Sequence, residues 1–180
     1  ALAKAYGLAS NFYGETHPSE ANYVAMLGGD TFGISDDDAY YCKPGSEEDG
    51  CSSADSEGYV HHTIMAPNLT DQLAAKGLSW KGYFENLPAP GSGVFRYPSS
   101  SEPVRGLPHS LYAAKHNGFM NFKSVQDDPL RARKIVAFDQ LAADIELFLC
   151  LVAGIKPTRC QEFLLRRFVI LQMIRLLEIL

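Results

Sequence analysis

Hydrophobic and polar residues alternate along this chain in short segments, which are separated by stretches rich in Gly, Pro and Ser. The first part of the chain predicts the last turns of a helix over 1–6, a weak strand over 8–13 and a helix over 18–27. An irregular region rich in Gly, Ser and acidic residues follows over 31–56. Helical and extended segments that alternate in this way are typical of an α/β protein.

The middle of the chain contains the clearest local signals. Asn68 is a favourable N-cap for a helix over 69–76, and Gly77 can end that helix in the left-handed conformation. The aromatic run 78–84 then predicts a strand. Glu85 follows at its end, either as a ligand-binding group of the kind that α/β proteins place there or as a surface acid beside a turn.

The second half of the chain begins with a proline-rich stretch over 88–108, which is predicted to be irregular, and a short helix follows over 111–116. From Pro129 to Ile145 apolar residues recur at helical spacing, with charged residues largely on the opposite side. This pattern predicts one amphipathic helix that lies on a sheet.

The segment THPSEANY, at the start of the predicted helix over 18–27, carries the most distinctive polar residues. It places the imidazole of His17, the hydroxyl of Ser19 and the carboxamide of Asn22 close together in sequence. Unpaired N–H groups and the helix dipole favour an anion such as phosphate at a helix start, which makes Ser19 a candidate nucleophile. The alternative is that Thr16 or Ser19 only caps the helix, since a Gly-x-Ser-x-Gly motif is absent.

Three segments of the chain resemble the secreted phosphoesterase family, which holds acid phosphatases and bacterial phospholipases C and is related to alkaline phosphatase and the sulfatases. They are THPSEANYVAMLGGDTFGI, NLTDQLAAKGLSWKGYFENLP and YAAKHNGFMNF, in the order and similar spacing of the family. The resemblance covers about residues 1–145. It implies an α/β fold there, the front part of an alkaline-phosphatase-like three-layer α/β/α domain.

The family's chemistry assigns roles to individual residues. A Ser or Thr hydroxyl attacks the phosphate ester, a divalent metal activates it, and water hydrolyses the resulting phospho-enzyme. Carried over by position, Ser19 is the nucleophile, Asn22 donates to a phosphoryl oxygen and His116 contacts the metal or the phosphate, with His17 assigned to substrate binding. Gly118 departs from the family, which usually has Pro there; this affects loop rigidity more than a catalytic atom.

The metal ligands of the family are expected outside the matching region. Relatives supply them from a Glu-Asn pair that ends an N-terminal strand and from Asp and His residues beyond the position of Ile145. Divalent metal sites need about four to six donor atoms. The chain is therefore predicted to be a fragment with an incomplete metal site and weak or absent activity of its own, and the metal's identity stays open.

The composition changes abruptly at Glu146, and 146–180 is predicted to be an apolar helical tail. Its apolar runs are broken at 156–159 and 166–167, and neither reaches the roughly 18 to 20 residues of a membrane span. The tail does not resemble the family's continuation, which favours an out-of-frame or mis-spliced translation. A helix that lies on a membrane surface is the alternative.

The cysteines form two unlike pairs. Cys42 and Cys51 flank a polar loop that a disulfide would close, whereas Cys150 and Cys160 lie in the apolar tail and are predicted to be small buried residues. With the sequon at Asn68, the disulfide indicates a secreted or extracellular protein. The chain begins without a signal peptide, which is expected to have been removed or to lie upstream of a cut.

Composition and net charge limit the classes of binding partner that the chain is expected to have. With 46% hydrophobic and 21% charged residues, the 180-residue chain is ordinary for a globular protein. Its net charge of -5 and its scattered Lys and Arg argue against nucleic acid. The acidic run 36–38 is predicted to be a solvated turn rather than a calcium loop, and His61 and His62 a solvated pair rather than a metal site.

The sequence therefore predicts a phosphate ester hydrolase, an exported phosphomonoesterase or phospholipase-type phosphodiesterase, with Ser19 as its nucleophile. Two alternatives stay open. One is a non-catalytic membrane-surface binding protein that uses 146–180, and the other is an acyl hydrolase that uses Ser19 with His17 or His116. The sequence pattern does not indicate the oligomeric state.

Overall fold

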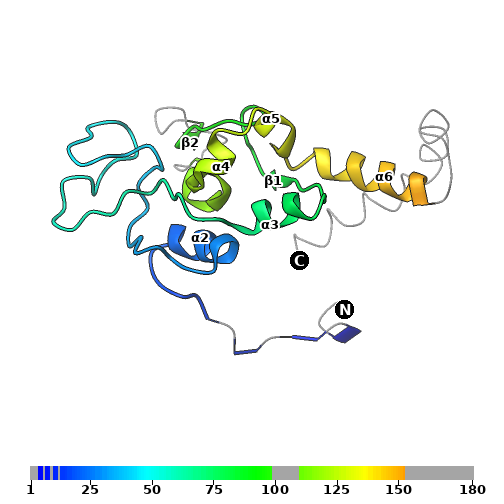
Figure 1. Ribbon diagram of the computed structural model, residues 1–180, viewed down its shortest axis with the longest axis horizontal. Coiled ribbons are helices and arrows are strands. Elements are labelled where there is room, and N and C mark those ends of the chain that lie inside the picture. The colour runs from blue at the N-terminus through cyan, green and yellow to red at the C-terminus, as the bar shows by residue number, and fades with distance from the viewer. Residues whose placement is uncertain (1–3, 6, 9, 12, 99–109, 153–180) are drawn as a thin grey trace.

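The structure, a computed structural model, describes residues 4–5, 7–8, 10–11, 13–98 and 110–152 of the chain. Its helices and strands are short and are joined by long loops (Figure 1). In chain order they are α2 (Glu20–Gly28), α3 (Leu69–Ala75), β1 (Gly82–Phe84), β2 (Arg96–Tyr97), β3 (Tyr112–Ala113), the 3-10 helices η1 (Ala114–His116) and η2 (Gly118–Asn121), α4 (Lys123–Gln126), α5 (Arg131–Lys134), β4 (Ile135–Ala137) and α6 (Gln140–Val152).

Two small sheets connect these elements. β1 and β4 run parallel and pair Gly82 with Ile135 and Phe84 with Ala137. β2 and β3 form an antiparallel pair. Because parallel strands need a long crossover connection, the first pairing brings together segments far apart in sequence. A mixture of helices with a small parallel sheet agrees with the predicted α/β class at that level.

The hydrophobic core lies where α2 packs against the segment that contains η2. Ala21 and Val24 of α2 are fully buried together with Met120 and Phe122. A Cβ atom at Gly118 would lie only 2.6 Å from the carbonyl oxygen of Tyr23, so the two backbones are in direct contact there. This contact fixes the loop around 116–118 against the helix that follows Ser19.

Replacing Gly118 with Ala is expected to lower the free energy of unfolding by about 1–3 kcal/mol. The added Cβ would overlap backbone atoms of Tyr23 and Val24, which cannot turn away as a side chain could. Urea unfolding followed by circular dichroism measures the effect. A midpoint equal to that of the unchanged protein would show that α2 and η2 can separate without cost.

A long loop leads from α2 to α3, as the irregular pattern over 31–56 predicts. The predicted disulfide between Cys42 and Cys51 is confirmed, with the two Cα atoms 5.4 Å apart. The cyan part of the ribbon in Figure 1 shows this loop extending away from the packed elements.

The acidic run 36–38 within this loop is not a solvated turn, and that prediction is wrong. Asp38 is only 1% exposed and accepts hydrogen bonds from the backbone N–H groups of Ser52 and Ser53, both at 2.8 Å, and from the Ser52 hydroxyl at 2.9 Å. The backbone donors to Asp38 lie 14 and 15 positions further along the chain, which local sequence does not reveal.

The amphipathic helix predicted over 129–145 is also wrong, because β4 separates α5 from α6. Ile135 and Val136 are buried β-branched residues that favour an extended backbone and pair with β1. The strand predicted over 78–84 is shortened to β1.

The predicted strand over 8–13 is absent from the residues of that stretch that the structure describes, and the side chains of Leu8 and Tyr13 are exposed. The short helix predicted over 111–116 is replaced by β3 and η1. The helix predicted over 1–6 falls mostly outside the described residues.

Asn68 forms the predicted N-cap of α3. Its Oδ1 accepts hydrogen bonds from the backbone N–H and the hydroxyl of Thr70, at 2.8 and 2.7 Å, and its Nδ2 donates to Asp71 at 2.9 Å and to Ser124 at 3.0 Å. Asn68 is 1% exposed. The amide nitrogen is thus buried and already donates twice, and glycosylation at the Asn68 sequon stays a prediction.

The C-terminal part is described as far as α6, which extends away from the other elements in Figure 1. α6 runs across position 145, and the proposed boundary between 1–145 and 146–180 stays a prediction. The side chains of Cys150 and Cys160 and the tail beyond 152 lie outside the described residues. In the part of the chain that the structure describes, helices are too short or too polar to cross a membrane.

Candidate active site

Ser19 lies immediately before α2 with helical backbone angles, φ -68° and ψ -40°, and is half-buried. Its side chain makes no capping hydrogen bond. The hydroxyl of Thr16 donates to the carbonyl of His17 at 3.3 Å. Neither hydroxyl therefore caps α2, and that of Ser19 stands at the positive end of the helix, where an anion is favoured.

Asn22 ties the segment before Ser19 to the first turn of α2. Its Oδ1 accepts from the N–H groups of Glu15 at 2.7 Å and Thr16 at 3.3 Å. Its Nδ2 donates to the carbonyl oxygens of Thr16 at 2.9 Å and Pro18 at 3.2 Å. In this arrangement Asn22 positions the backbone that carries Ser19, and donation to a phosphoryl oxygen would require one of these loop contacts to be exchanged.

Ser19 and Asn22 line a surface groove of about 680 Å³ together with Tyr13, Tyr23 and Met26. Two of these three residues are aromatic and Met26 is also largely apolar, so the groove offers apolar surface beside the Ser19 hydroxyl. The two histidines assigned from the sequence do not line it.

His116 ends η1 and packs its ring against that of Tyr23 on α2, with the ring centroids 5.3 Å apart. Burial lowers the pKa of His116, the charge of Lys115 lowers it further, and the charge of Asp37 opposes them. The imidazole is therefore neutral at neutral pH and can accept a hydrogen bond or bind a metal. This places His116 beside α2, but no hydrogen bond joins it to Ser19 among the described residues.

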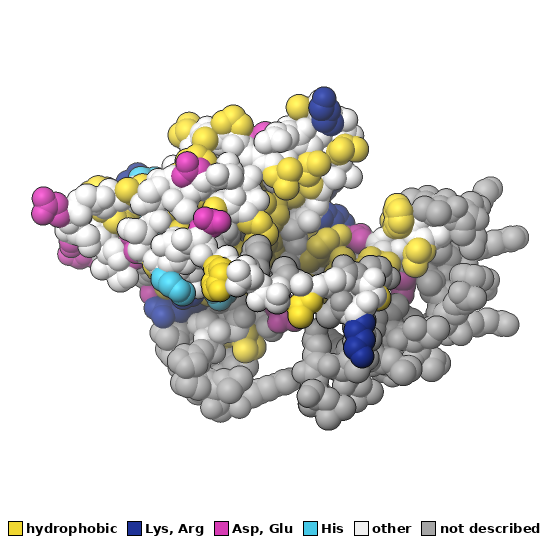
Figure 2. All heavy atoms as spheres, turned by 90° about the horizontal axis from the view of Figure 1, so that it is seen from below, with side chains coloured by type: hydrophobic (Ala, Val, Ile, Leu, Met, Phe, Trp, Pro, Cys, Tyr) yellow, Lys and Arg dark blue, Asp and Glu magenta, His cyan; other side chains and the backbone are white. Residues whose placement is uncertain are grey.

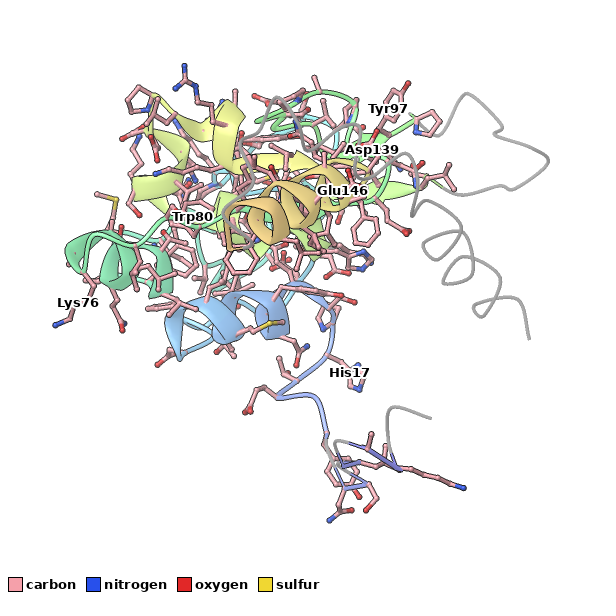
Figure 3. All side chains as sticks on the ribbon, turned by 90° about the vertical axis from the view of Figure 1, so that its right-hand side faces the viewer. His17, Lys76, Trp80, Tyr97, Asp139 and Glu146 are labelled. Atoms are coloured by element: carbon pink, nitrogen blue, oxygen red, sulfur yellow. A yellow bond between two sulfur atoms is a disulfide. The ribbon has the colours of Figure 1, made fainter. Side chains whose placement is uncertain are left out.

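His17 is exposed on the segment that precedes α2, outside the packed elements, as Figure 3 shows. No hydrogen bond from its imidazole to Ser19 is present in the described part of the chain. The structure therefore brings Ser19, Asn22 and His116 onto adjoining elements and leaves His17 beside them on the surface.

A buried polar cluster lies directly behind the start of α2. His62 is 0% exposed, and its Nδ1 lies 2.9 Å from Oε1 of Glu20, which is 2% exposed. Nδ2 of Asn121 donates to the same Glu20 oxygen and, at 3.1 Å, to the carbonyl of His62. Nε2 of His62 lies 3.1 Å from a carboxylate oxygen of Asp36, close enough for an ion pair but without hydrogen-bond geometry.

The sequence prediction of a solvated histidine pair is wrong for His62, although His61 is exposed. Glu20 and Asn121 lie 42 and 59 positions away from His62, so nothing in the local sequence could have indicated their contact. In the structure burial alternates over 61–64, so His62 and Ile64 point to the same side of an extended segment, and the residue types alone gave no signal of this.

Burial and the contacts within the cluster act in opposite directions on the pKa values of Glu20 and His62. Burial raises the pKa of the Glu20 carboxyl, and the contacts with His62 and Asn121 offset this only in part. Burial also lowers the pKa of the His62 imidazole, but the hydrogen bond and charge of Glu20 together with the charge of Asp36 outweigh it. The net result is a His62 pKa above its ordinary value of 6.5, which favours the charged imidazolium beside Glu20.

The protein is expected to lose stability as the pH rises above about 6.5. With its pKa raised on folding, His62 keeps a proton that the unfolded chain releases, so its contribution is complete below the unfolded pKa and disappears as pH rises through the folded pKa. Urea unfolding at a series of pH values measures this decline. The double variant Glu20→Gln/His62→Gln lacks both groups and should show a flatter profile; two coinciding profiles would contradict the assignment.

Comparison with known proteins places these residues in a family. The model of the phosphoesterase family matches residues 1–147. An acid phosphatase of Aspergillus fumigatus is 33% identical over 138 residues, which are 77% of this chain and 25% of that protein. A phosphate-repressible acid phosphatase of Penicillium chrysogenum is 31% identical over 145 residues, 81% of this chain and 29% of its own length.

A more distant relative is a phosphatidylinositol-3-phosphatase of Mycobacterium tuberculosis, 30% identical over 124 residues, 69% of this chain and 31% of that protein. No solved structure matches the chain. The chain spans between a quarter and a third of the length of these curated relatives. Because the family model covers most of the 180 residues, the chain belongs to the phosphoesterase family.

Proposed function

We propose that this chain forms the Ser19-bearing part of a phosphate ester hydrolase of the acid phosphatase type. The observation that carries the proposal is the placement of Ser19 at the start of α2, half-buried, with no capping hydrogen bond from its side chain and with a groove beside it. The phosphatase names of the relatives support the same reaction class.

In the proposed reaction the Oγ atom of Ser19 attacks phosphorus, and the bond from phosphorus to the alcohol oxygen of the ester breaks. Water then cleaves the phosphoserine and releases phosphate. The positive end of α2 favours the phosphoryl charge, and Asn22 holds the loop that presents the hydroxyl. His116, neutral at neutral pH, is the candidate for a phosphate contact, with His17 at the edge of the site.

A divalent metal is proposed for the longer proteins of this type, where it would activate the nucleophile. The described residues do not fit such an ion by themselves, because none of their groupings brings three or more His, Cys, Asp or Glu side chains into a metal site. The residues that would hold the metal are therefore proposed to come from outside the described part.

The chain is also proposed to form part of a larger α/β/α domain. The parallel pairing of β1 with β4 supports a larger alkaline-phosphatase-like sheet between two helical layers, to which this chain contributes one part. Secretion is supported by the disulfide between Cys42 and Cys51, which is typical of oxidising compartments.

A phosphate ester is the proposed substrate, and nucleic acid is not a proposed partner. On the face that Figure 2 presents, Lys and Arg side chains lie apart from one another rather than in a stripe that could follow a phosphate backbone.

The test is to trap the phospho-enzyme. The full chain is incubated with p-nitrophenyl phosphate, with and without divalent metal ions, quenched in acid and digested for mass spectrometry. A phosphoryl group on the peptide that contains Ser19 supports the proposal. A phosphoryl group on another residue, or release of p-nitrophenol from the acetate ester instead of the phosphate ester, would contradict it.

A further inference from the structure

One carboxylate connects the two halves of the proposed site. Oδ1 of Asp37 accepts a hydrogen bond at 3.1 Å from the backbone N–H of Glu20, the residue directly after Ser19. Oδ2 of the same side chain accepts at 2.8 Å from the ammonium group of Lys115, the residue directly before His116. Asp37 lies 17 positions from Glu20 and 78 positions from Lys115, so the link is purely tertiary.

The loop that carries Asp37 is held on both sides. Asp36 lies against the buried His62 and accepts from the N–H of Asp38 at 3.0 Å. Asp38 is anchored by its three hydrogen bonds from Ser52 and Ser53. Asp37 therefore projects from a backbone whose neighbours on either side are fixed, which is the arrangement that lets a side chain act as a rigid spacer.

The ion pair itself is partly exposed. The side chain of Asp37 is 26% exposed and that of Lys115 is 34% exposed. Pairs with this exposure contribute little to the free energy of folding, because water screens the charges. The contact is therefore expected to act mainly by orienting the Ser19–Glu20 peptide relative to η1.

We propose that Asp37 is a positioning residue that fixes the Ser19 hydroxyl relative to the His116 imidazole. The proposal rests on the proposed function of Ser19 and adds a role for the acidic loop. The ring contact between Tyr23 and His116 is the second link between the same two elements, and it reports directly on their relative placement.

The experiment compares Asp37→Asn and Lys115→Met with Asp128→Asn in the full chain. Asp128 is a matched control, because its carboxylate also accepts from a backbone N–H, that of Leu130 at 2.7 Å, and from an ammonium group, that of Lys134 at 2.6 Å. These contacts belong to the region of α5, which Figure 1 shows apart from α2.

Two readouts separate positioning from stability. In solution NMR spectra, the nuclear Overhauser effect between the rings of Tyr23 and His116 is expected to weaken in Asp37→Asn and in Lys115→Met but not in Asp128→Asn. In a longer protein that is extended at both ends of this chain, kcat with p-nitrophenyl phosphate is expected to fall by about 10 to 100-fold at similar KM in the first two variants, because small misplacements of reacting groups are costly. Lys115→Arg, which keeps the charge, should restore most of the rate.

The outcomes are distinct. An unchanged ring contact in Asp37→Asn overturns the proposal whatever the activity shows, and so does a rate loss matched by an equal loss of folded protein. A weakened contact with an unchanged melting temperature supports it. Since the NMR arm needs no turnover, failure of Ser19 as the nucleophile would appear separately, as an unchanged rate in Ser19→Ala.

Discussion

In a longer protein that is extended at both ends of this chain, replacing Ser19 with Ala is expected to lower the rate of phosphate ester hydrolysis by about 10³-fold or more, the scale of losing a covalent nucleophile. The hydroxyl makes no capping hydrogen bond, so the substitution removes the attacking atom without removing a structural contact at the start of α2. The rate of p-nitrophenol release from the phosphate ester measures the effect, and urea unfolding should show the same midpoint for both proteins.

Ser79→Ala is the control, because Ser79 is an exposed serine in the segment between α3 and β1. It should leave the rate unchanged. If Ser19→Ala also keeps the rate of the unchanged protein, the nucleophile must be another residue, and the assignment of α2 as the phosphate-binding helix would fail with it.

The sequence predicts the parts of this site that depend on local chemistry. The helix start at Ser19 and the N-cap at Asn68 are encoded by a few neighbouring residues, and the structure has helices close to both expected places. The disulfide between Cys42 and Cys51 could also be predicted from the sequence, since the short polar loop between the two cysteines keeps them close. The family resemblance is carried by such local segments, which explains why it too could be recognised.

What the sequence could not predict depends on distant partners. The segment around Ile135 has a helical pattern, yet it forms β4 because a strand partner at Gly82 is available to pair with it. His62 and Asp38 look like solvent-exposed polar residues until Glu20, Ser52 and other distant groups surround them. Burial of polar groups is decided by the whole fold, so a single local window gives no access to it.

These buried contacts also link the chemistry to the stability of the domain. Glu20 follows Ser19 directly, and its carboxylate is held by His62 and Asn121 behind the helix. The same residue donates its backbone N–H to Asp37 in front of the cluster. The start of α2 is thus fixed from its buried side and from its surface side, which is the support that a nucleophile on a helix start requires.

Replacing His62 with Ala is expected to lower the free energy of unfolding by about 3–5 kcal/mol near neutral pH. The substitution removes the partner of Glu20 and leaves a carboxylate that is 2% exposed without its compensating charge. It also opens a cavity where the imidazole stacks on Tyr59, at a centroid distance of 5.6 Å. Urea unfolding at neutral pH measures the loss, which would be a large fraction of the stability of an ordinary domain.

The neighbouring variant His61→Ala is the control, because His61 is exposed, and it should change the free energy of unfolding by less than about 0.5 kcal/mol. Adding Glu20→Gln to His62→Ala should recover part of the loss, since the buried charge is then removed along with its partner. The loss should also shrink in acid, where the raised pKa of Glu20 lets the carboxyl take up a proton. Equal effects of His61→Ala and His62→Ala would show that the buried ion pair contributes nothing to holding the start of α2.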